Sequence, residues 1–108
     1  MKKFINNVDD FLKESLNGFG KAHSEIIKVN FEPNFISRKK KTKEGKVSLI
    51  SGGGSGHEPM HGGFVGHGML DAACPGFVFS APTPDQMQAA AENVDSGAGV
   101  LFLSLIHI

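Results

Sequence analysis

The chain is poor in cysteine, and it contains no tryptophan and no tyrosine. Its single cysteine, Cys74, excludes an internal disulfide, and we expect it to be a small buried residue because Pro75 and Gly76 follow it in an apolar stretch. Net charge is also absent, since 11 basic residues balance 11 acidic ones. Nucleic-acid-binding proteins normally have a basic excess, so that class is not favoured.

Long apolar runs are missing as well. No segment approaches the roughly 18 apolar residues of a membrane span. The residues after Met1 include Asn6, Asn7, Asp9 and Asp10, which interrupt any signal-peptide apolar region. We therefore expect a cytoplasmic protein that binds neither nucleic acid nor a membrane.

The 108 residues suit a single domain, and a hydrophobic content of 40% with 20% charged residues is typical of a globular protein. Charge gathers locally in one place, at Arg38, Lys39, Lys40, Lys41 and Lys43. Such a cluster could bind phosphate or a membrane surface. Because no aromatic residue is interleaved with the charges, we favour a solvated loop between two strands.

The hydrophobic pattern predicts an α/β fold, a parallel sheet with flanking helices. The expected elements are an amphipathic helix over Phe4–Phe19, a loop with a short extended piece over Glu25–Phe35, a strand at Lys46–Ser51, a short helix within Gly62–Leu70, a strand at Phe77–Ser80, a helix from Thr83 to about Val94, and a strand at Gly99–Leu105. Gly18 and Gly20 are taken as stop signals for the first helix. Thr83 and Gln86 have the spacing of a capping box.

A glycine-rich segment, Gly52–His57, follows the Lys46–Ser51 strand directly. Ligands of parallel sheets bind beyond the carboxyl ends of the strands, so the segment is placed to form a site. It is not a phosphate loop of the Gly-Lys-Ser/Thr type, because His57 and Glu58 follow the last glycine. It is not a dinucleotide fingerprint either, because Pro59 stands where the third glycine is needed. The pattern indicates a small polar ligand.

His57 is the candidate catalytic residue of this segment. Imidazole titrates near neutral pH and can accept a proton from a hydroxyl group. The alternative is a histidine that only fixes the turn through a hydrogen bond to the backbone. A metal site built from His57, Glu58 and His61 is not favoured, because Pro59 interrupts the helix that such ligands need.

Several motifs resemble one known family. The run from Leu49 to His61, Leu-Ile-Ser-Gly-Gly-Gly-Ser-Gly-His-Glu-Pro-Met-His, closely resembles the signature of the dihydroxyacetone kinase K-subunit family. The runs 66–70, 73–76 and 80–85 and the opening residues 1–6 are similar to the same family. The Glu-Pro-Met-His and Pro-Thr-Pro-Asp stretches look more like bacterial subunits that use the phosphotransferase system than like ATP-dependent single-chain enzymes.

The resemblance implies a subunit that holds dihydroxyacetone while a companion phosphorylates it to dihydroxyacetone phosphate. By position, Gly54, Ser55, Gly56 and His57 match the substrate loop of the family, and His57 matches its general-base or substrate-orienting histidine. The implied partners are a nucleotide-carrying L subunit and a phosphotransferase M subunit, with a homodimer for the full-length protein. Nucleotide and magnesium are expected on the companion, so this subunit itself is expected to bind no cofactor and no metal.

The resemblance covers residues 1 to about 103 and then stops. The family continues with a lysine and an Asn-Tyr-Thr-Gly-Asp run that supplies a catalytic aspartate, and a more distant histidine forms a hemiaminal with the substrate. Here residues 104–108 depart from the family, Leu105 stands at the place of the lysine, and His107 does not match the hemiaminal histidine. We therefore expect the chain to be the truncated N-terminal portion of a DhaK-type domain, inactive alone. Two alternatives stay open: an ATP-dependent dihydroxyacetone kinase, and a non-enzymatic ligand sensor on the same fold.

Overall fold

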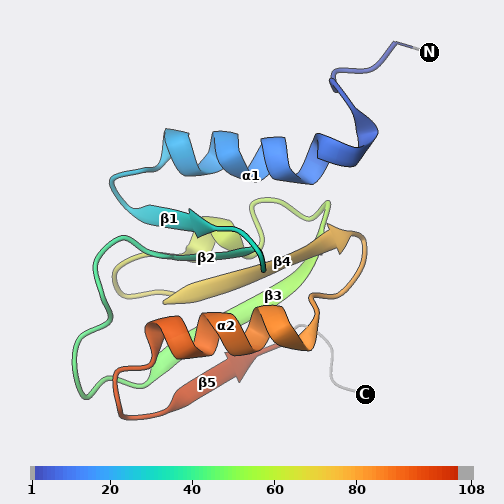
Figure 1. The fold of residues 1–108 in the computed structure, drawn as a ribbon. Coiled ribbons are helices and arrows are strands. Elements are labelled where there is room, and N and C mark those ends of the chain that lie inside the picture. The colour runs from blue at the N-terminus through green and yellow to red at the C-terminus, as the bar shows by residue number, and fades with distance from the viewer. Residues whose placement is uncertain (1, 105–108) are drawn as a thin grey trace.

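The computed structural model describes residues 2–104 and contains a five-stranded sheet in the order β1-β2-β4-β3-β5 (Figure 1). The strands are β1 (Ile27–Asn30), β2 (Phe35–Arg38), β3 (Ser48–Ser55), β4 (Ala72–Val78) and β5 (Val100–Leu103). Two helices, α1 (Phe11–Ala22) and α2 (Pro84–Val94), flank the sheet, and 3-10 turns lie at Val8–Asp10 and Gly62–Phe64. The predicted α/β fold with flanking helices is confirmed.

The sheet is parallel on one side and antiparallel on the other. β3 lies between β4 and β5 and is parallel to both, as predicted. β1 and β2 pair with each other in antiparallel fashion, and β2 pairs in antiparallel fashion with β4. The predicted loop with a short extended piece over Glu25–Phe35 does contain one short strand, β1, but its pairing with β2 as a hairpin was not predicted. These strands are only four residues long, and strands this short depend on pairing with distant segments more than on their own sequence pattern.

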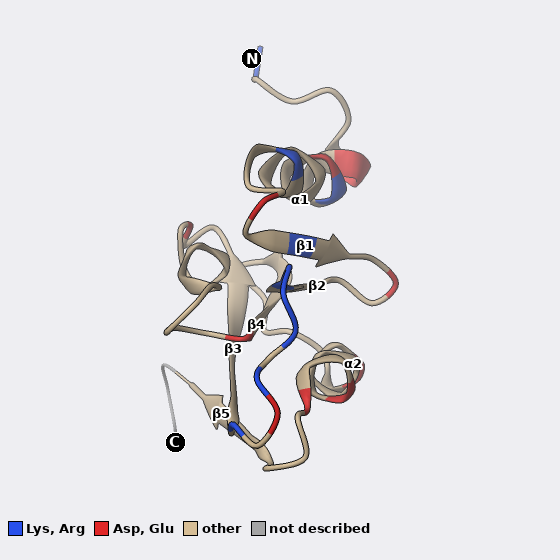
Figure 2. Ribbon diagram, turned by 90° about the vertical axis from the view of Figure 1, so that its left-hand side faces the viewer, with Lys and Arg blue, Asp and Glu red and all other residues tan. Residues whose placement is uncertain are grey.

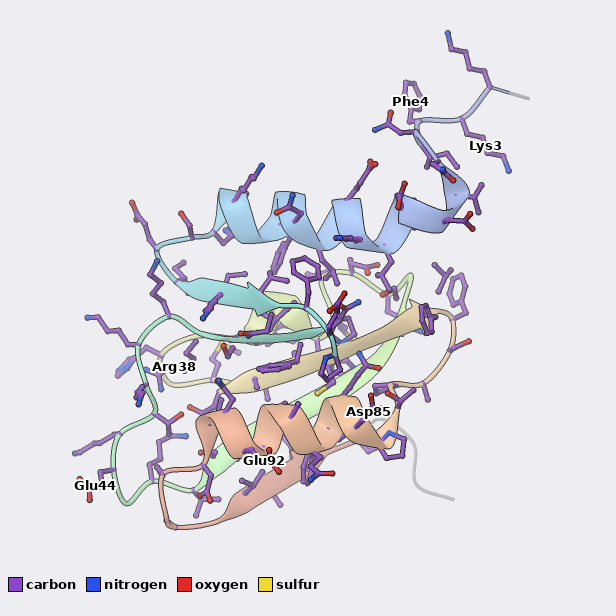
Figure 3. The ribbon with its side chains drawn as sticks, viewed as in Figure 1. Lys3, Phe4, Arg38, Glu44, Asp85 and Glu92 are labelled. Carbon is purple, nitrogen blue, oxygen red and sulfur yellow. The ribbon has the colours of Figure 1, made fainter. Side chains whose placement is uncertain are left out.

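The first helix begins and ends later than predicted. Phe4 lies outside it with its side chain in solvent (Figure 3), and α1 starts only at Phe11. Before it, the Asn7 side chain accepts a hydrogen bond from Asp9 N–H and caps the 3-10 turn. Gly20 does not stop the helix. A Cβ there would lie 2.8 Å from Val29 Cγ2, so this glycine lets α1 approach β1 closely.

The predicted start of the second long helix is confirmed. Thr83 precedes α2 as its N-cap, and its N–H donates to Gln86 Oε1 at 2.9 Å. The same buried Gln86 donates from Nε2 to Asn34 O and to Pro75 O, both at 2.8 Å. The first turn of α2 is thereby joined to the β1–β2 turn and to β4. Asp85 and Glu92 are exposed on this helix (Figure 3).

The two remaining strand predictions need new boundaries. β4 begins at Ala72 and ends at Val78, whereas the sequence predicted Phe77–Ser80. Small residues at the start of β4 have weak strand propensity, and pairing with β3 on one side and β2 on the other holds them extended. Within the predicted Gly62–Leu70 helix only the 3-10 turn forms. β5 covers Val100–Leu103, and the predictions for Leu105 and His107 lie outside the described residues.

The core has one part on each face of the sheet. On the α1 face the buried residues are Leu16, Ile27, Ile36, Val65, Leu70 and Ala73. On the α2 face they are Phe35, Ile50, Ala72, Cys74, Ala90 and Val94. Cys74 is fully buried, as predicted, and burial raises the pKa of its thiol to about 12.

Much of the basic cluster follows the prediction, with one correction. Lys39, Lys40, Lys41 and Lys43 are exposed on the connection from β2 to β3 (Figure 2). Arg38 instead belongs to β2, and its guanidinium lies 3.1 Å from the Asp71 carboxylate, whose exposed fraction is 0%. A buried carboxylate needs charge and hydrogen-bond partners, and this requirement draws Arg38 inward.

Asp71 collects four donors at the start of β4. Besides Arg38 these are Lys46 Nζ at 2.7 Å, Leu49 N at 2.8 Å and Thr42 Oγ1 at 3.1 Å. Burial alone would raise the pKa of Asp71, but the four donors outweigh it and hold that pKa below its usual value.

Among residues 2–104, no helix has the length and apolar character needed to cross a membrane.

Candidate functional site

The predicted glycine loop is in large part strand. β3 continues through Ser55, with Gly52 paired to Cys74 and Gly53 paired to Pro75 of β4. The expectation of a loop beginning at Gly52 was therefore wrong, because pairing with a parallel neighbour extends these glycines. A Cβ on Gly52 would lie 2.7 Å from Cys74 O, so the missing side chain permits this close strand packing.

The end of β3 lies where the connections of neighbouring strands diverge. After β3 the chain passes over the α1 face, where Val65 and Leu70 join the core. After β4 it passes through α2, whose Ala90 and Val94 pack on the opposite face. In parallel α/β sheets such a divergence opens a crevice at the carboxyl ends of the strands, which is the usual place for a ligand. The predicted site residues are therefore in the expected position.

Gly54 and Gly56 let the turn after β4 pack directly on the end of β3. A Cβ on Gly54 would lie 2.7 Å from Ser80 N and 2.9 Å from the Phe79 backbone. Gly56 has a φ of 118°, which a residue with a side chain rarely adopts, and a Cβ there would lie 2.7 Å from the Phe79 ring. Backbone therefore meets backbone at Gly54, and at Gly56 the backbone meets the Phe79 ring.

Ser55 points into the protein. Its hydroxyl donates to Gly76 O at 2.8 Å, and its own carbonyl accepts the Phe79 N–H at 2.7 Å. The side chain is thus used to join the ends of β3 and β4. A ligand at Ser55 would meet the backbone and not the hydroxyl.

His57 is exposed just beyond the end of β3. Its ring stands perpendicular to the Phe79 ring, with centroids 5.5 Å apart. The turn that carries it is closed by a hydrogen bond of 2.9 Å from Gly56 N–H to Glu58 Oε2. The imidazole is therefore open to a ligand while the backbone beneath it is fixed. Gly54, Ser55, Gly56 and His57 are brought together as one continuous segment.

His61 lies behind this segment and is more enclosed. Its Nδ1 is 3.0 Å from Ser51 Oγ, which also donates to Leu103 O at 2.9 Å. Its Nε2 is buried beside Gly53 and has no hydrogen-bond partner within residues 2–104. Burial lowers the pKa of His61, and the charge of His57 lowers it further. Because the Ser51 hydroxyl donates to Leu103 O, its oxygen accepts from His61 Nδ1–H. The lowered pKa of His61 favours the neutral ring, and this hydrogen bond places the ring proton on Nδ1.

A cavity of 320 Å³ adjoins the site on the α1 side. Its polar wall includes Gly54, Ser55, Glu58 and His61, and its apolar wall includes Leu16 and other α1 residues. His57 is not among the residues that line this cavity. Within residues 2–104, no three histidine, cysteine, aspartate or glutamate side chains lie where they could share a metal ion.

Sequence reasoning missed two features of the site. Phe79 was placed in a strand, and nothing in its neighbourhood indicated that the chain turns there toward His57. The Ser51–His61 pair was also missed, although alternation along the strand from Lys46 to Ser51 could have placed the Ser51 side chain on the same face as Leu49.

The match to known families decides the classification. A model of the Dak1 domain matches residues 17–105. The chain belongs to the Dak1 domain family. This Dak1 chain is 50% identical over 103 residues to the dihydroxyacetone-binding subunit of the PEP-dependent dihydroxyacetone kinase from Escherichia coli K12, covering 95% of this chain and 29% of the relative. The resemblance inferred from the motifs is confirmed.

Solved structures share the fold of the Dak1 chain. The dihydroxyacetone kinase of C. freundii, crystallised with AMP-PNP and Mg²⁺, is similar with a TM-score of 0.84 and 34% identity, over 94% of this chain and 19% of that one. A dihydroxyacetone kinase operon co-activator, Dha-DhaQ, is similar with a TM-score of 0.76 and 38% identity, over 82% of this chain and 27% of that one. The Dak1 chain thus spans less than a third of each of these relatives.

Proposed function

We propose that this chain supplies part of the dihydroxyacetone site of a kinase that makes dihydroxyacetone phosphate. The observation that carries the proposal is the segment Gly54–His57, which ends the parallel strand β3 and leaves the His57 imidazole in solvent. Dihydroxyacetone is a small neutral ketone with two hydroxyl groups. Backbone N–H and C=O groups at a strand end suit such a ligand.

His57 carries the chemistry in this proposal. The hydroxyl group of dihydroxyacetone loses its proton to the imidazole while its oxygen forms a bond to the terminal phosphorus of the donor, and the donor's leaving oxygen departs. His57 orients the same hydroxyl before transfer. The family that the motifs resemble also uses a catalytic aspartate and a hemiaminal-forming histidine, and we assign neither role to residues 2–104.

The donor reaches this site from a companion. We assign nucleotide and magnesium to an L subunit and the supply of phosphoryl groups from phosphoenolpyruvate to an M subunit, with the dihydroxyacetone-binding subunit acting as a homodimer. The support is the 50% identity to a subunit of a PEP-dependent kinase. The glycine segment also lacks the lysine that a phosphate loop needs, because His57 and Glu58 follow Gly56.

The test is calorimetric titration with dihydroxyacetone, using the longest natural polypeptide that contains this sequence. We expect saturable binding that weakens at least tenfold in His57→Gln, because a group that contacts the ligand is removed. The matched control is His67→Gln, since His67 is also exposed but lies outside the Gly54–His57 segment. Absence of binding with His57 intact would refute the proposal.

Two alternatives have observations in their favour. An ATP-dependent kinase is supported by the likeness to the C. freundii enzyme crystallised with AMP-PNP. A non-enzymatic ligand sensor is supported by the likeness to the operon co-activator. Turnover assays separate the three: activity with phosphoenolpyruvate and the companion proteins supports the leading proposal, activity with ATP alone supports the first alternative, and ketone binding without turnover in either assay supports the second.

A further inference from the structure

Phe79 combines three features that the proposed function does not use. It has a φ of 52° although it is not glycine, which is an uncommon conformation for a bulky residue. The residue is 71% exposed, so burial of the ring does not explain that conformation. The ring nevertheless has one aromatic partner among the described residues, the perpendicular imidazole of His57.

The backbone around Phe79 holds it in this conformation. Phe79 N–H donates to Ser55 O at 2.7 Å, and Ser80 N–H donates to Phe77 O at 2.9 Å, which closes a tight turn after β4. The missing side chains of Gly54 and Gly56 make room for this turn and for the ring. A residue in a sparsely populated φ region persists only where its surroundings fix it, and such residues gather at functional sites.

The direction of the ring is therefore determined by the ends of both parallel strands. β3 supplies the carbonyl of Ser55 and the space at Gly56, and β4 leads directly into the turn. Phe77 provides the contrast: it is similarly exposed, at 68%, but it has no aromatic partner among the described residues. Exposure of an aromatic residue is common to the two positions, and contact with the imidazole is specific to Phe79.

We propose that Phe79 is a positioning residue that sets the orientation of the His57 imidazole through their edge-to-face contact. The inference rests on the proposed function for its consequence in catalysis, since it assigns His57 a proton-accepting role. Phe79 itself takes no proton and forms no bond. It limits the rotation of His57 so that one ring nitrogen faces the ligand, and small errors in such an orientation lower the rate of transfer.

The experiment compares Phe79→Leu, Phe79→Tyr and Phe77→Leu in the longest natural polypeptide that contains this sequence. Leucine keeps the apolar bulk and loses the ring, tyrosine keeps the ring, and Phe77→Leu makes the same change two residues away. Histidine-ring NMR, with His57 assigned through His57→Gln, reports the ring-current shift. Turnover of dihydroxyacetone with its companion proteins reports kcat and KM.

We expect Phe79→Leu to move the His57 ring proton signals and to lower kcat/KM roughly 3- to 10-fold, mostly through kcat. Phe79→Tyr should keep both the His57 signals and kcat/KM close to those of the unaltered protein, and Phe77→Leu should change neither. Equal effects of Phe79→Leu and Phe77→Leu would overturn the inference. So would the absence of a nuclear Overhauser effect between the rings of residues 57 and 79 in the unaltered protein, a measurement that needs no variant to fold.

Failure of the proposed function gives a different result. If the unaltered protein neither binds nor turns over dihydroxyacetone, the kinase proposal fails, while the NMR comparison still decides whether Phe79 orients His57. If the ketone is turned over and Phe79→Leu leaves both the NMR signals and kcat unchanged, the inference about Phe79 fails and the kinase proposal stands.

Discussion

The two ends of the β3–β4 pair are built in opposite ways. At the amino end of β4, the chain buries Asp71 and surrounds it with the long side chains of Arg38 and Lys46. At the carboxyl ends, Gly54 lets the backbones come into direct contact, and Gly56 makes room for the Phe79 ring. The first arrangement uses side chains to fasten the sheet. The second uses one short side chain, the Ser55 hydroxyl that donates to Gly76 O, and the rings of His57 and Phe79 stay exposed beside it.

The largest effect is expected at the charged end. Asp71→Asn keeps the shape of the side chain but removes the negative charge from the buried pair with Arg38. We expect the free energy of unfolding to fall by about 3 to 5 kcal/mol, because a buried pair is broken on one side only. Urea unfolding followed by circular dichroism measures this. Glu44→Gln, an exposed residue of the β2–β3 connection (Figure 3), should stay within about 0.5 kcal/mol of the unaltered protein.

The glycine end should be less sensitive in stability but more sensitive in binding. Gly54→Ala places a methyl group against the backbone of Phe79 and Ser80. We expect a loss of about 1 to 3 kcal/mol from overpacking, together with weaker dihydroxyacetone binding because the turn that carries Phe79 is displaced. Chemical denaturation and calorimetric titration measure the two quantities. If Gly54→Ala lowered stability and left dihydroxyacetone binding unchanged, Gly54 would be needed for packing but not for the ligand site.

Acid titration distinguishes the two ends by pH. The pKa of His61 is lowered in the fold, so its neutral form contributes stability that is present above its ordinary pKa of 6.5 and is lost as pH falls through the lower folded value. The pKa of Asp71 is also lowered, so its contribution is present above 3.8 and is lost at still lower pH. Each group should add a slope of at most about 1.4 kcal/mol per pH unit.

The measurement is the free energy of unfolding as a function of pH for the unaltered protein and two variants. His61→Gln should remove the part of the slope that begins below pH 6.5, and Asp71→Asn should remove the part that begins below pH 3.8. An unchanged slope below pH 3.8 in Asp71→Asn would contradict the assignment of that step.

The smallest effect is expected at a glycine that belongs to neither end. Gly18 lies inside α1, and a Cβ there would meet nothing within 4 Å. Gly18→Ala should therefore stabilise the protein by up to about 1 kcal/mol through helix propensity, measured as a rise in melting temperature. A loss of stability would show that glycine is required in this chain for reasons other than close backbone contact.

The parts of the fold with local sequence signals could be predicted. The capping pair Thr83 and Gln86 fixed the start of α2, and a β-rich run ending in glycines located β3 and the candidate site at its carboxyl end. The hairpin of β1 and β2 could not be predicted, because its four-residue strands are defined by pairing with each other and with β4. Local pattern carries little information about such pairing.

The same distinction applies to the site. Gly54–His57 is a continuous segment and was visible as one. Phe79 reaches His57 only because β3 and β4 are parallel neighbours whose ends coincide, and Asp71 attracts Arg38 only after folding buries it. Contacts between distant segments depend on the arrangement of the strands, which the sequence alone indicates only in outline.

The buried thiol of Cys74 has a practical consequence for spectroscopy. A thiol reacts as the thiolate, and with a pKa of about 12 and full burial Cys74 forms almost none at neutral pH. Because these 108 residues contain no other cysteine, maleimide dyes and spin labels should find no native target in the folded chain. A single cysteine introduced at an exposed position such as Lys13 would accept the probe selectively, and distances from α1 to the ligand site could then be followed without first removing a native residue.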